Sequence, residues 1–504
     1  MARIRAPEFP KNTTWLNTDR PLSLKELKGR IIILDFWTYC CINCLHVLPE
    51  LKYLENKYKN SLTVIGVHSG KFNNEKNIEN IRQAILRYDI EHPVIVDNNF
   101  DIWHQYVVRA WPTLVLIDTE SYYLGSVAGE GNRDALDEVI SQVITKHQES
   151  GKIQFAELNL NLEKQRKPVL TPLAFPGKVL ADERGDRLFI ADSGHHRIII
   201  SNLAGEILHI IGTGKPGLTD GAFNEAQFFA PQGMALDSDH QILYIADTEN
   251  HCLRLIYLEE QMVTTIAGTG EQSHQIFSPS KLGLQTALNS PWDVEKIGNK
   301  LFIAMAGSHQ IWQMDITSGI IQNYAGIGAE SCVDGLLAES AFSQPSGITT
   351  DGKELYIADS EISSIRGVGT GENATVTTLC GSGELFGFGD KDGYGLEVRL
   401  QHCLGVEYSH NYLWVADTYN HKIKRVNTRN GYCETIIGNN ISGYKDGEAK
   451  NSLFSEPSGL SATKSHLYIA DTNNHCIRQV ELDTMQVKTM HFPGLCSPNI
   501  CFPS

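Results

Sequence analysis

A short motif recurs six times in the C-terminal two thirds of this 504-residue chain. Each copy is an apolar run typical of a β-strand, and five of the six end in Ala-Asp. Successive copies lie 55, 58, 54, 58 and 54 residues apart, at Phe189–Asp192, Tyr244–Asp247, Phe302–Met305, Tyr356–Asp359, Trp414–Asp417 and Tyr468–Asp471. A period above about 20 residues is typical of solenoids and propellers, in which each copy forms one structural unit. The sequence therefore predicts six such units.

A second landmark supports a common fold for these units. Four Asp-Gly pairs each place their aspartate 13 residues before a later glycine: Asp220 and Gly233, Asp334 and Gly347, Asp392 and Gly405, Asp446 and Gly459. Asp-Gly suits a turn with positive φ, and the later glycine is predicted to begin an innermost strand, so these residues are expected to shape the crossing between units. The third unit has Ser280 and Asp293 instead, and we expect it to be irregular.

Five of the six units also carry a histidine four residues after the motif: His196, His251, His309, His421 and His475. One interpretation is a metal channel, as in a propeller hydrolase with a metal on its axis. However, a residue repeated in nearly every unit usually serves a need common to all units, such as closing a turn by hydrogen bonding, whereas a metal site needs one asymmetric cluster. The repetition therefore favours a structural role.

The six copies resemble NHL repeats, in which each repeat is a four-stranded sheet that forms one blade of a β-propeller. The resemblance implies a six-bladed propeller over residues 171–495, followed by a tail over residues 496–504. Such a ring is a rigid platform with its loops gathered at either end, which is typical of an interaction surface.

The N-terminal part of the chain carries a Cys-x-x-Cys pair, Cys41 and Cys44, between an apolar strand-like run and a helical pattern. A helix N-terminus presents unpaired N–H groups and a partial positive charge, which lower the pKa of a cysteine there and favour its thiolate. Cys41 is therefore the expected nucleophile. Cys44 lies one helical turn further on, where it can attack a mixed disulfide on Cys41 and release the reduced product.

Strand and helix patterns alternate around this motif, which predicts an α/β domain over residues 1–150. Strands are expected at Ile31–Phe36, Leu62–Val67, His92–Asp97 and Leu114–Asp118, and helices at Leu45–Tyr58, Glu75–Tyr88 and Asp134–His147. Residues 151–170 are polar, with a brief alternating stretch from Phe155 to Leu162, and are expected to form a linker or a docking strand. The predicted class is a multidomain chain, α/β followed by all-β.

The N-terminal domain resembles the thioredoxin fold. In that family an Asp-Phe-Trp strand end leads to the active-site cysteines and a proline kinks the next helix, as Asp35, Phe36, Trp37 and Pro49 do here. Asp35 would then lie beneath the cysteines as a buried carboxylate with a raised pKa, able to exchange a proton with Cys44. The alternative is an inert strand aspartate.

Far downstream, the thioredoxin family has a cis-proline that faces the disulfide, and residues 109–113, Arg-Ala-Trp-Pro-Thr, fit it. A cis Trp111–Pro112 bond would leave the backbone of Trp111 free to pair with an extended substrate beside Cys41. We therefore predict four catalytic residues, Cys41, Cys44, Asp35 and Pro112, and three accessory ones, Cys40, Trp37 and Trp111.

Two departures from thioredoxins mark the motif. Cys40 stands where thioredoxins have tryptophan, and Ile42-Asn43 replaces their Gly-Pro. Without the proline, one more backbone N–H is available at the helix start, which would stabilise the Cys41 thiolate and make the protein more oxidising. Cys40 is a third redox thiol, a strained partner of Cys41 or, as we favour, a small apolar filler or accessory thiol.

Other thiol chemistries fit the motif less well. Zinc takes four ligands, and the only nearby histidine, His46, would project from the following helix. Thr38 stands three residues before Cys41 as in peroxiredoxins, but the proline of that family is Leu34 here. No metal or other cofactor is therefore expected, apart from a redox-active disulfide between Cys41 and Cys44.

Composition bears on partners and on location. The chain has 43 Lys and Arg against 59 Asp and Glu, a net charge of −16, so its surface should repel nucleic acid and anionic membranes. It has no apolar segment typical of a secretion signal or a membrane span, which predicts a cytoplasmic protein. The eight cysteines outside the motif lack metal-ligand spacing and are expected to be mostly reduced.

A thioredoxin-like domain with a Cys-Cys-Ile-Asn-Cys site followed by six NHL repeats resembles the NHL-repeat-containing protein 2 family and its bacterial relatives over nearly the whole chain. The resemblance implies a cytosolic protein with a redox-type fold and a propeller interaction surface. Our leading hypothesis is a thiol–disulfide oxidoreductase whose protein or peptide client is selected by the propeller and whose reductant is unidentified. Alternatively, the propeller binds the partner and the thioredoxin-like domain is a redox sensor or docking module.

Overall fold

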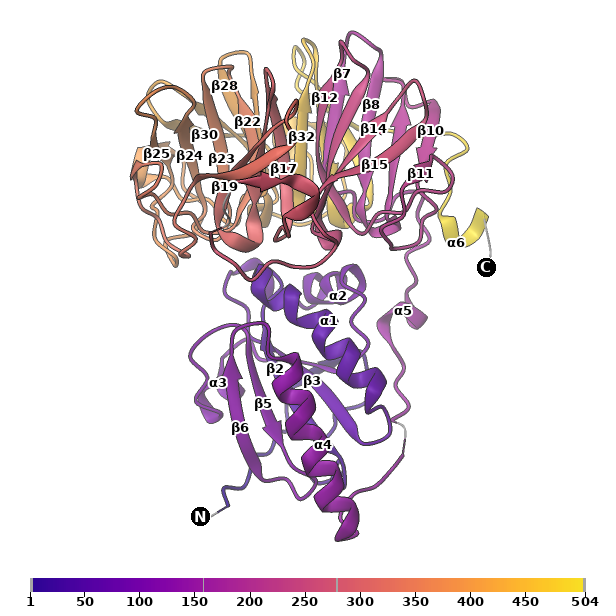
Figure 1. Ribbon diagram of the computed structural model, residues 1–504. Helices are drawn as coiled ribbons and strands as arrows, with labels where there is room; N and C mark the ends of the chain where they lie inside the picture. Colours follow the sequence, from indigo (N-terminus) through magenta and orange to yellow (C-terminus); the bar gives the residue numbers. More distant parts are fainter. Residues whose placement is uncertain (1–2, 157, 278–279, 502–504) are drawn as a thin grey trace. The chain divides into compact units, whose positions relative to one another are not determined.

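The computed structural model describes residues 3–156, 158–277 and 280–501, and it divides into two compact units between Val169 and Leu170 (Figure 1). The first unit holds the Cys-x-x-Cys motif in an α/β fold, and the second holds the six repeats in an all-β fold, as the sequence predicts. Among the described residues, no helix is both long and apolar enough to cross a membrane.

The first unit is built on a six-stranded sheet in the order β1-β4-β3-β2-β5-β6. In this sheet β2, β3 and β4 are parallel, whereas β1, β5 and β6 run antiparallel to their neighbours. The strands are β1 (Thr14–Leu16), β2 (Ile31–Trp37), β3 (Leu62–His68), β4 (Val94–Val96), β5 (Thr113–Ile117) and β6 (Tyr123–Ala128). Every residue of β2 and β3 is buried, as expected for central strands that are covered on both faces.

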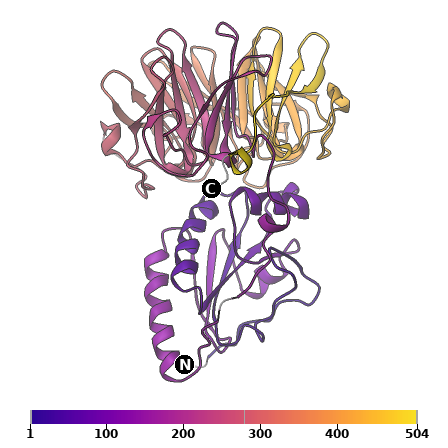
Figure 2. The same cartoon turned by 90° about the vertical axis from the view of Figure 1, so that its right-hand side faces the viewer.

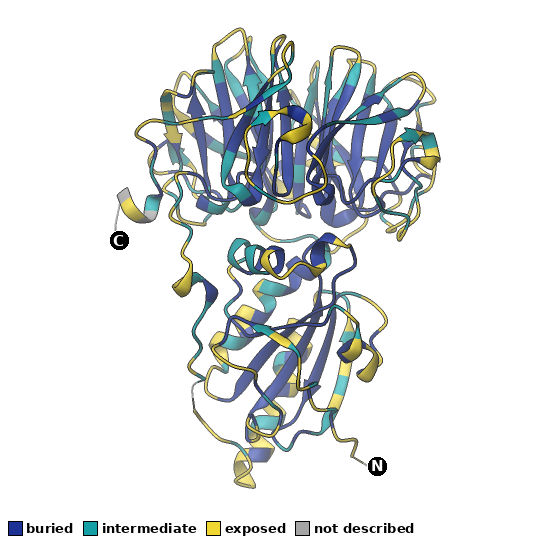
Figure 3. Cartoon of the chain, turned by 180° about the vertical axis from the view of Figure 1, so that it is seen from behind, coloured by how far each residue is buried: buried dark blue, intermediate teal, exposed yellow. Residues whose placement is uncertain are grey.

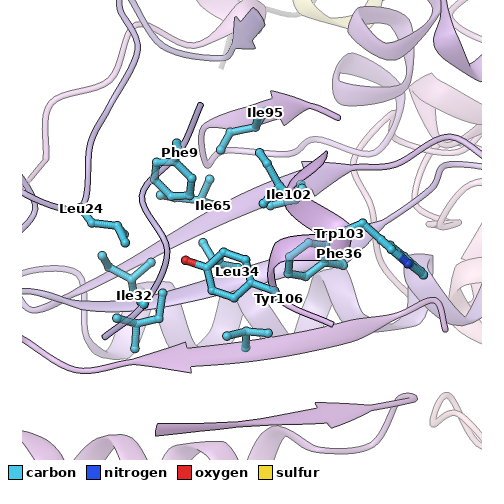
Figure 4. Packing of buried hydrophobic residues seen from close by; sticks show 14 of the residues in the cluster. Phe9, Leu24, Ile32, Leu34, Phe36, Ile65, Ile95, Ile102, Trp103 and Tyr106 are labelled. Carbon is cyan, nitrogen blue, oxygen red and sulfur yellow. The ribbon is translucent and has the colours of Figure 1, made fainter. Parts of the chain in front are cut away.

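Helices pack on both faces of this sheet. The described residues of the first unit form the helices α1 (Ile42–Lys57), α2 (Ile78–Arg87), α3 (Asp101–Gln105), α4 (Arg133–Glu149) and α5 (Glu163–Arg166). On one face, Val47 of α1 and Ile140 of α4 share a core cluster with Ile33 of β2. On the other face, Trp103 of α3 shares a second cluster with Phe36 of β2 (Figure 4). Successive side chains of β2 point to opposite faces of the sheet, so they pack into two separate cores.

The predicted elements of the first unit agree with the observed ones to within a few residues at each end, with one exception. The helix predicted over Glu75–Tyr88 is broken into a 3-10 turn, η1 (Asn74–Lys76), and α2. The side chain of Asn77 accepts a hydrogen bond from the Glu79 N–H at 2.9 Å and caps α2, so the helix starts there. The sequence did not predict the shorter elements β1, β6, α3 and α5.

The segment after α4 contains no β-strand in its described residues, 151–156 and 158–169. Its backbone instead runs along the first unit. The Gln154 N–H donates to the Gly29 carbonyl at 2.8 Å, and the Ala156 N–H donates to the Asn60 carbonyl at 3.0 Å. The segment then forms α5.

The second unit is a propeller of six antiparallel sheets, one for each repeat (Figures 1 and 2). Blade one is β7 (Val179–Asp182), β8 (Arg187–Asp192), β9 (Arg197–Ser201) and β10 (Ile207–Ile211). Blade two is β11 (Gly221–Ala222), β12 (Pro231–Asp237), β13 (Ile242–Asp247), β14 (Cys252–Tyr257) and β15 (Met262–Ala267). Blade three is β16 (Lys281–Leu282), β17 (Pro291–Ile297), β18 (Lys300–Met305), β19 (Gln310–Asp315) and β20 (Ile320–Ala325).

The remaining blades follow the same plan. Blade four is β21 (Gly335–Leu336), β22 (Pro345–Thr350), β23 (Glu354–Asp359), β24 (Ser364–Gly369) and β25 (Thr375–Cys380). Blade five is β26 (Gly393–Tyr394), β27 (Gly405–Ser409), β28 (Tyr412–Asp417), β29 (Lys422–Asn427) and β30 (Tyr432–Ile437). Blade six is β31 (Gly447–Glu448), β32 (Pro457–Ala462), β33 (His466–Asp471), β34 (Cys476–Glu481) and β35 (Gln486–Thr489), and α6 (Pro498–Cys501) follows it.

The innermost strands β7, β12, β17, β22, β27 and β32 contact one another in turn and close the ring. The strands of the blades are largely buried and their connecting loops are exposed (Figure 3). In blades two to six, a two-residue strand that precedes the blade pairs with its outermost strand. Four of these short strands begin at the glycine of a predicted Asp-Gly pair, and Gly221, for example, has the predicted positive φ, +144°. The Asp-Gly pairs therefore complete the outer edge of these four blades.

A buried ion pair recurs in four blades and joins the two sequence landmarks. It links the repeated aspartate of the second strand to a cation on the third: Asp247–Arg254, Asp359–Arg366, Asp417–Lys424 and Asp471–Arg478, at 2.7, 3.0, 3.5 and 2.8 Å. Each cation also contacts the aspartate of an Asp-Gly pair: Asp220, Asp334, Asp392 and Asp446. In each of these four blades, one cation thus contacts both the repeated aspartate and the aspartate of the Asp-Gly pair, which explains why both aspartates recur.

The recurring histidines have a structural role, as we favoured. Each ends a 3-10 turn in the left-handed conformation, and its Nδ1 accepts a hydrogen bond from a backbone N–H of the next blade. The pairs are His196 with Ala230, His251 with Ser290, His309 with Gln344, His421 with Glu456 and His475 with Phe175, at 3.0 to 3.2 Å. In blade four the Ser363 hydroxyl takes this place, accepting from the His402 N–H at 3.0 Å. The contacts close the ring from blade six to blade one.

We expect His421→Ala to lower the free energy of unfolding of the propeller by about 1–3 kcal/mol, because the buried N–H of Glu456 loses this acceptor. Chemical denaturation of the full chain, followed by a signal from the propeller, measures the loss. His240→Ala is the control, since that side chain is 74% exposed and should leave the midpoint unchanged. Equal stability of both variants and the wild type would contradict the inter-blade role.

The third blade has the same strand order as blades two, four, five and six, so it is not irregular in topology. It differs in its side chains, since Met305 stands where the other blades have the repeated aspartate. Its Asp293 stands where four other blades have glycine, and blade one has Lys178 at the same place. Lys178 Nζ lies 2.9 Å from Asp293 Oδ2 and also donates to the carbonyls of Ser346 and Leu404, at 3.0 and 2.8 Å. The two exceptions to the glycine pattern therefore pair with each other within the ring of innermost strands.

Candidate redox site

The two cysteines of the motif lie where β2 ends and α1 begins. Cys41 is the N-cap of α1, with φ −83° and ψ 114°, and its carbonyl accepts from the N–H groups of Cys44 and Leu45 at 3.0 and 3.2 Å. In the sheet, Thr113 pairs with Phe36, so the preceding Pro112 lies at the same end of the sheet as the motif. The fold thus brings Pro112 to the end of the sheet that carries the cysteines, although about 70 residues of chain separate them.

The two thiols differ in environment. Cys41 is partly exposed, whereas Cys44 is fully buried, and the two side chains are hydrogen-bonded. Burial, and then this contact with Cys41, hold the pKa of Cys44 well above its usual range. At neutral pH Cys44 is therefore a protonated thiol. This asymmetry suits an attacking Cys41 and a resolving Cys44.

Asp35 lies within β2 and is fully buried. Neither of its carboxylate oxygens has a hydrogen-bond partner among the described residues. Burial raises the pKa of Asp35 to about 7, against a lowering by the charge of His92 and together with a smaller raising effect of Glu55. A carboxyl group that titrates near neutral pH can both accept and return a proton under physiological conditions.

A buried carboxylate holds the loop that leads into the motif. Glu75 Oε1 accepts from the Thr38 hydroxyl at 2.7 Å and from the Cys40 N–H at 2.9 Å, and Oε2 accepts from the Phe72 N–H at 2.9 Å. Glu75 thus fixes Thr38 and Cys40, in the loop that precedes Cys41, from a separate segment of the chain. The sequence analysis placed Glu75 in a helix and gave it no role, because its partners in the motif loop, Thr38 and Cys40, lie more than 30 residues away.

The residues around the predicted cis-proline pack firmly. The Trp111–Pro112 peptide is cis, as predicted. The ring of Trp111 lies 4.6 Å from that of Trp103, centroid to centroid. The Gly129 N–H donates to the Pro112 carbonyl at 2.9 Å, and the Thr113 hydroxyl donates to the Ala110 carbonyl at 2.7 Å. These contacts anchor the segment on both sides of the proline.

Two of the accessory residues are buried. Trp37, the last residue of β2, is fully buried, and its ring meets that of His68 edge-on at 5.0 Å. Cys40 is 2% exposed, and its sulfur lies 3.9 Å from the Thr38 hydroxyl oxygen. Its low exposure fits a small filler better than a thiol that meets substrate.

The alternative metal chemistry gains no support. His46 Nδ1 lies 2.5 Å from Glu130 Oε2, which occupies that nitrogen. In the described part of the chain, no group of three or more His, Cys, Asp or Glu side chains is arranged to hold a metal ion. Of the eight cysteines outside the motif, six are free thiols, Cys252, Cys332, Cys380, Cys403, Cys433 and Cys476, whereas Cys496 is disulfide-bonded.

The fold and this site define a class: a thioredoxin-like domain with a Cys-x-x-Cys motif, joined to an NHL-repeat propeller. Sequence comparison agrees, since the thioredoxin-like family matches residues 29–122 and the NHL repeat matches residues 454–480. The chain is 41% identical over 525 residues to human NHL repeat-containing protein 2, covering 97% of this chain and 71% of that protein. The chain therefore belongs to the NHL repeat-containing protein 2 family.

Two further relatives differ in extent. Protein SUPPRESSOR OF QUENCHING 1, chloroplastic, of Arabidopsis thaliana is 42% identical over 510 residues, which cover 98% of this chain and 48% of that protein. The chain therefore spans about half the length of this relative. Thiol-disulfide oxidoreductase ResA of Bacillus cereus is 27% identical over 124 residues, 25% of this chain and 69% of that protein.

Proposed function

We propose that the chain is a thiol–disulfide oxidoreductase in which Cys41 attacks and Cys44 resolves. The observation that carries the proposal is the asymmetry of the pair: a partly exposed Cys41 at a helix N-terminus, hydrogen-bonded to a fully buried Cys44. The relative ResA of Bacillus cereus is named a thiol-disulfide oxidoreductase, which is in keeping with this chemistry.

The proposed reaction is a two-step exchange. The Cys41 thiolate attacks one sulfur of a client disulfide, which forms a mixed disulfide and releases the other client sulfur as a thiolate. Cys44 then loses its proton to Asp35 and attacks the Cys41 sulfur, which forms the Cys41–Cys44 disulfide and releases the second client thiolate. The enzyme dithiol loses two electrons and the client disulfide gains them, and an external dithiol reductant of unidentified nature restores the dithiol.

We propose that Pro112 and Trp111 border the groove in which an extended client lies beside Cys41. The support is positional, since both residues lie at the end of the sheet where the motif begins. Trp37 and Cys40 would support the site from below, because both are buried. No cofactor beyond the cysteine pair is part of the proposal.

The propeller is proposed to select the client, which we take to be a protein or peptide rather than nucleic acid or a membrane, in line with the net charge of −16. Large apolar side chains on its loops and edges favour a protein partner: Tyr394, Leu396 and Tyr444 are each about 60% exposed. The six free thiols of the propeller are in keeping with a reducing compartment, for which we propose the cytoplasm.

The same apolar residues also support a second candidate, in which the propeller is an interaction scaffold and the thioredoxin-like domain is a redox sensor. In that case the cysteine pair would change its redox state without turning over a client. The two candidates differ in whether a client becomes covalently attached to Cys41.

We expect Cys44→Ser to accumulate a mixed disulfide with a client protein in cells, because Cys41 attacks but nothing resolves the intermediate. Non-reducing electrophoresis of the captured full chain, with and without dithiothreitol, detects the adduct. The control is the double variant Cys41→Ser/Cys44→Ser, which should form none. If the single variant also forms no reducible adduct, the scaffold is the better description.

A further inference from the structure

Three unpartnered polar groups converge beneath the cysteine pair. The two carboxylate oxygens of Asp35, the indole Nε1 of Trp37 and the imidazole Nε2 of His92 are buried, and none has a hydrogen-bond partner among the described residues. Buried polar atoms are nearly always satisfied by protein or by ordered water, so a group of them in one place indicates a function.

A glycine makes room for these groups. In the parallel pair of β2 and β3, Asp35 is the register partner of Gly66. A Cβ on Gly66 would lie 2.9 Å from Trp37 Nε1 and 3.4 Å from His92 Nε2. The absence of a side chain at this position therefore keeps a polar space open on the sheet beside Asp35.

His92 continues from this space toward the surface. It is 3% exposed, and its other nitrogen, Nδ1, lies 3.4 Å from Glu55 Oε2. The Glu55 side chain is 26% exposed and lines an open hollow of about 370 Å³ together with Lys52, Lys59, Glu91 and Leu160. His92 and Glu55 thus lie between the polar space beside Asp35 and the solvent-exposed hollow.

We propose that His92 and Glu55 form a proton relay that connects Asp35 to solvent in this hollow. The proposal rests on the oxidoreductase function proposed above. When Cys44 attacks the mixed disulfide, its proton passes to Asp35, through a bound water to His92 Nε2, and from His92 Nδ1 to Glu55 and solvent. The same path returns a proton to Cys44 when the disulfide is reduced. His92 and Glu55 are positioning and proton-transfer residues that do not touch the client.

The charged groups around Asp35 and His92 favour proton transfer from Asp35 through His92 to Glu55. The titratable groups facing Asp35 are Cys44, His92 and Glu55, and those facing His92 are Glu55, Asp35 and Glu91. Burial lowers the pKa of His92, but the neighbouring carboxylates outweigh burial and raise the pKa overall, which favours the protonated imidazole.

The relay can be tested by measuring the attack by Cys41 and the resolution by Cys44 as separate kinetic phases. One equivalent of dithiobis(nitrobenzoate) releases a first coloured thiolate when Cys41 attacks and a second when Cys44 resolves. For Glu55→Gln and for His92→Gln, we expect the first phase to match the wild type and the plateau rate of the second phase at alkaline pH to fall about 10-fold or more. His92→Gln keeps a polar side chain beside Glu55, which protects against loss of the fold.

Glu91→Gln is the matched control, because Glu91 lines the same hollow but has no hydrogen bond to His92. A purely electrostatic effect of Glu55 would move the midpoint of the second phase to lower pH, since Glu55 raises the pKa of Asp35, and would leave the plateau unchanged. That result, or wild-type kinetics in both variants, would overturn the relay. Absence of a second phase in the wild type would instead refute the proposed oxidoreductase, and the relay with it.

Discussion

Cys41→Ser is expected to lower the rate of insulin-disulfide reduction by about 1,000-fold or more, because a serine hydroxyl is not ionised at neutral pH and cannot form the mixed disulfide. The buried Cys44 cannot replace it, since the side chain has no exposed surface and burial raises the pKa of its thiol. Turbidity of reduced insulin in the presence of dithiothreitol, corrected for the uncatalysed rate, measures the loss.

The matched control is Cys332→Ser, which removes a partly exposed free thiol of the propeller and should retain wild-type activity. Cys40→Ser tests the accessory thiol in the same assay. A rate within two-fold of the wild type would agree with a filler role, as the 2% exposure of Cys40 suggests. Equal rates for Cys41→Ser and the wild type would exclude the proposed enzyme.

The propeller could be predicted from sequence because its information is local and repeated. Each blade occupies one stretch of 54 to 58 residues, and the same Ala-Asp, histidine and Asp-Gly landmarks recur in that stretch. A structural need shared by all blades therefore appears as a pattern. The ion pair of Asp471, Arg478 and Asp446 is one such need, since all three lie within a single repeat.

Asp293 shows where this logic fails. Within its own repeat it looked like a defect, because a glycine belongs at that place. Its partner Lys178 lies 115 residues earlier, in another blade, at another exception to the glycine pattern. Only the closed ring brings the two side chains together, so a repeat-by-repeat comparison treats both as irregularities.

The redox site was predicted only in part, because sequence motifs identify residues that are close in the chain but not contacts between distant segments. Cys41, Cys44 and Asp35 lie within ten residues of one another, and the Trp-Pro-Thr segment resembles a family motif. Glu75 and His92 belong to no motif, and their roles arise from contacts made across the sheet by the fold. The unpartnered atoms of Asp35 could not be foreseen from sequence either, because they depend on the packing of three separate segments.

Arg366→Met is expected to lower the free energy of unfolding of the propeller by about 3–5 kcal/mol, because it leaves the buried carboxylate of Asp359 without its cation. Arg366 is fully buried and also contacts Asp334 at 2.8 Å, and it donates to the carbonyls of Ala341 and Val333. One substitution therefore removes the link between the inner and outer strands of blade four. Urea denaturation of the full chain, followed by a signal from the propeller, measures the change.

The chain itself offers the matched control. Blade five carries Lys424 at the equivalent position, where it pairs with Asp417 and Asp392, so Arg366→Lys should lower the free energy of unfolding much less than Arg366→Met.

The deficit in unfolding free energy of Arg366→Met should also depend on pH. Burial raises the pKa of Asp359 to about 6, above its unfolded value, and Arg366 opposes this rise. A carboxyl group with a raised folded pKa favours folding below its unfolded pKa and loses that contribution as the pH rises through the folded value. Loss of Arg366 raises the folded pKa further, so the deficit should be largest near pH 8 and shrink toward pH 5. A deficit that is independent of pH would mean that lost packing, rather than an uncompensated charge, accounts for the effect.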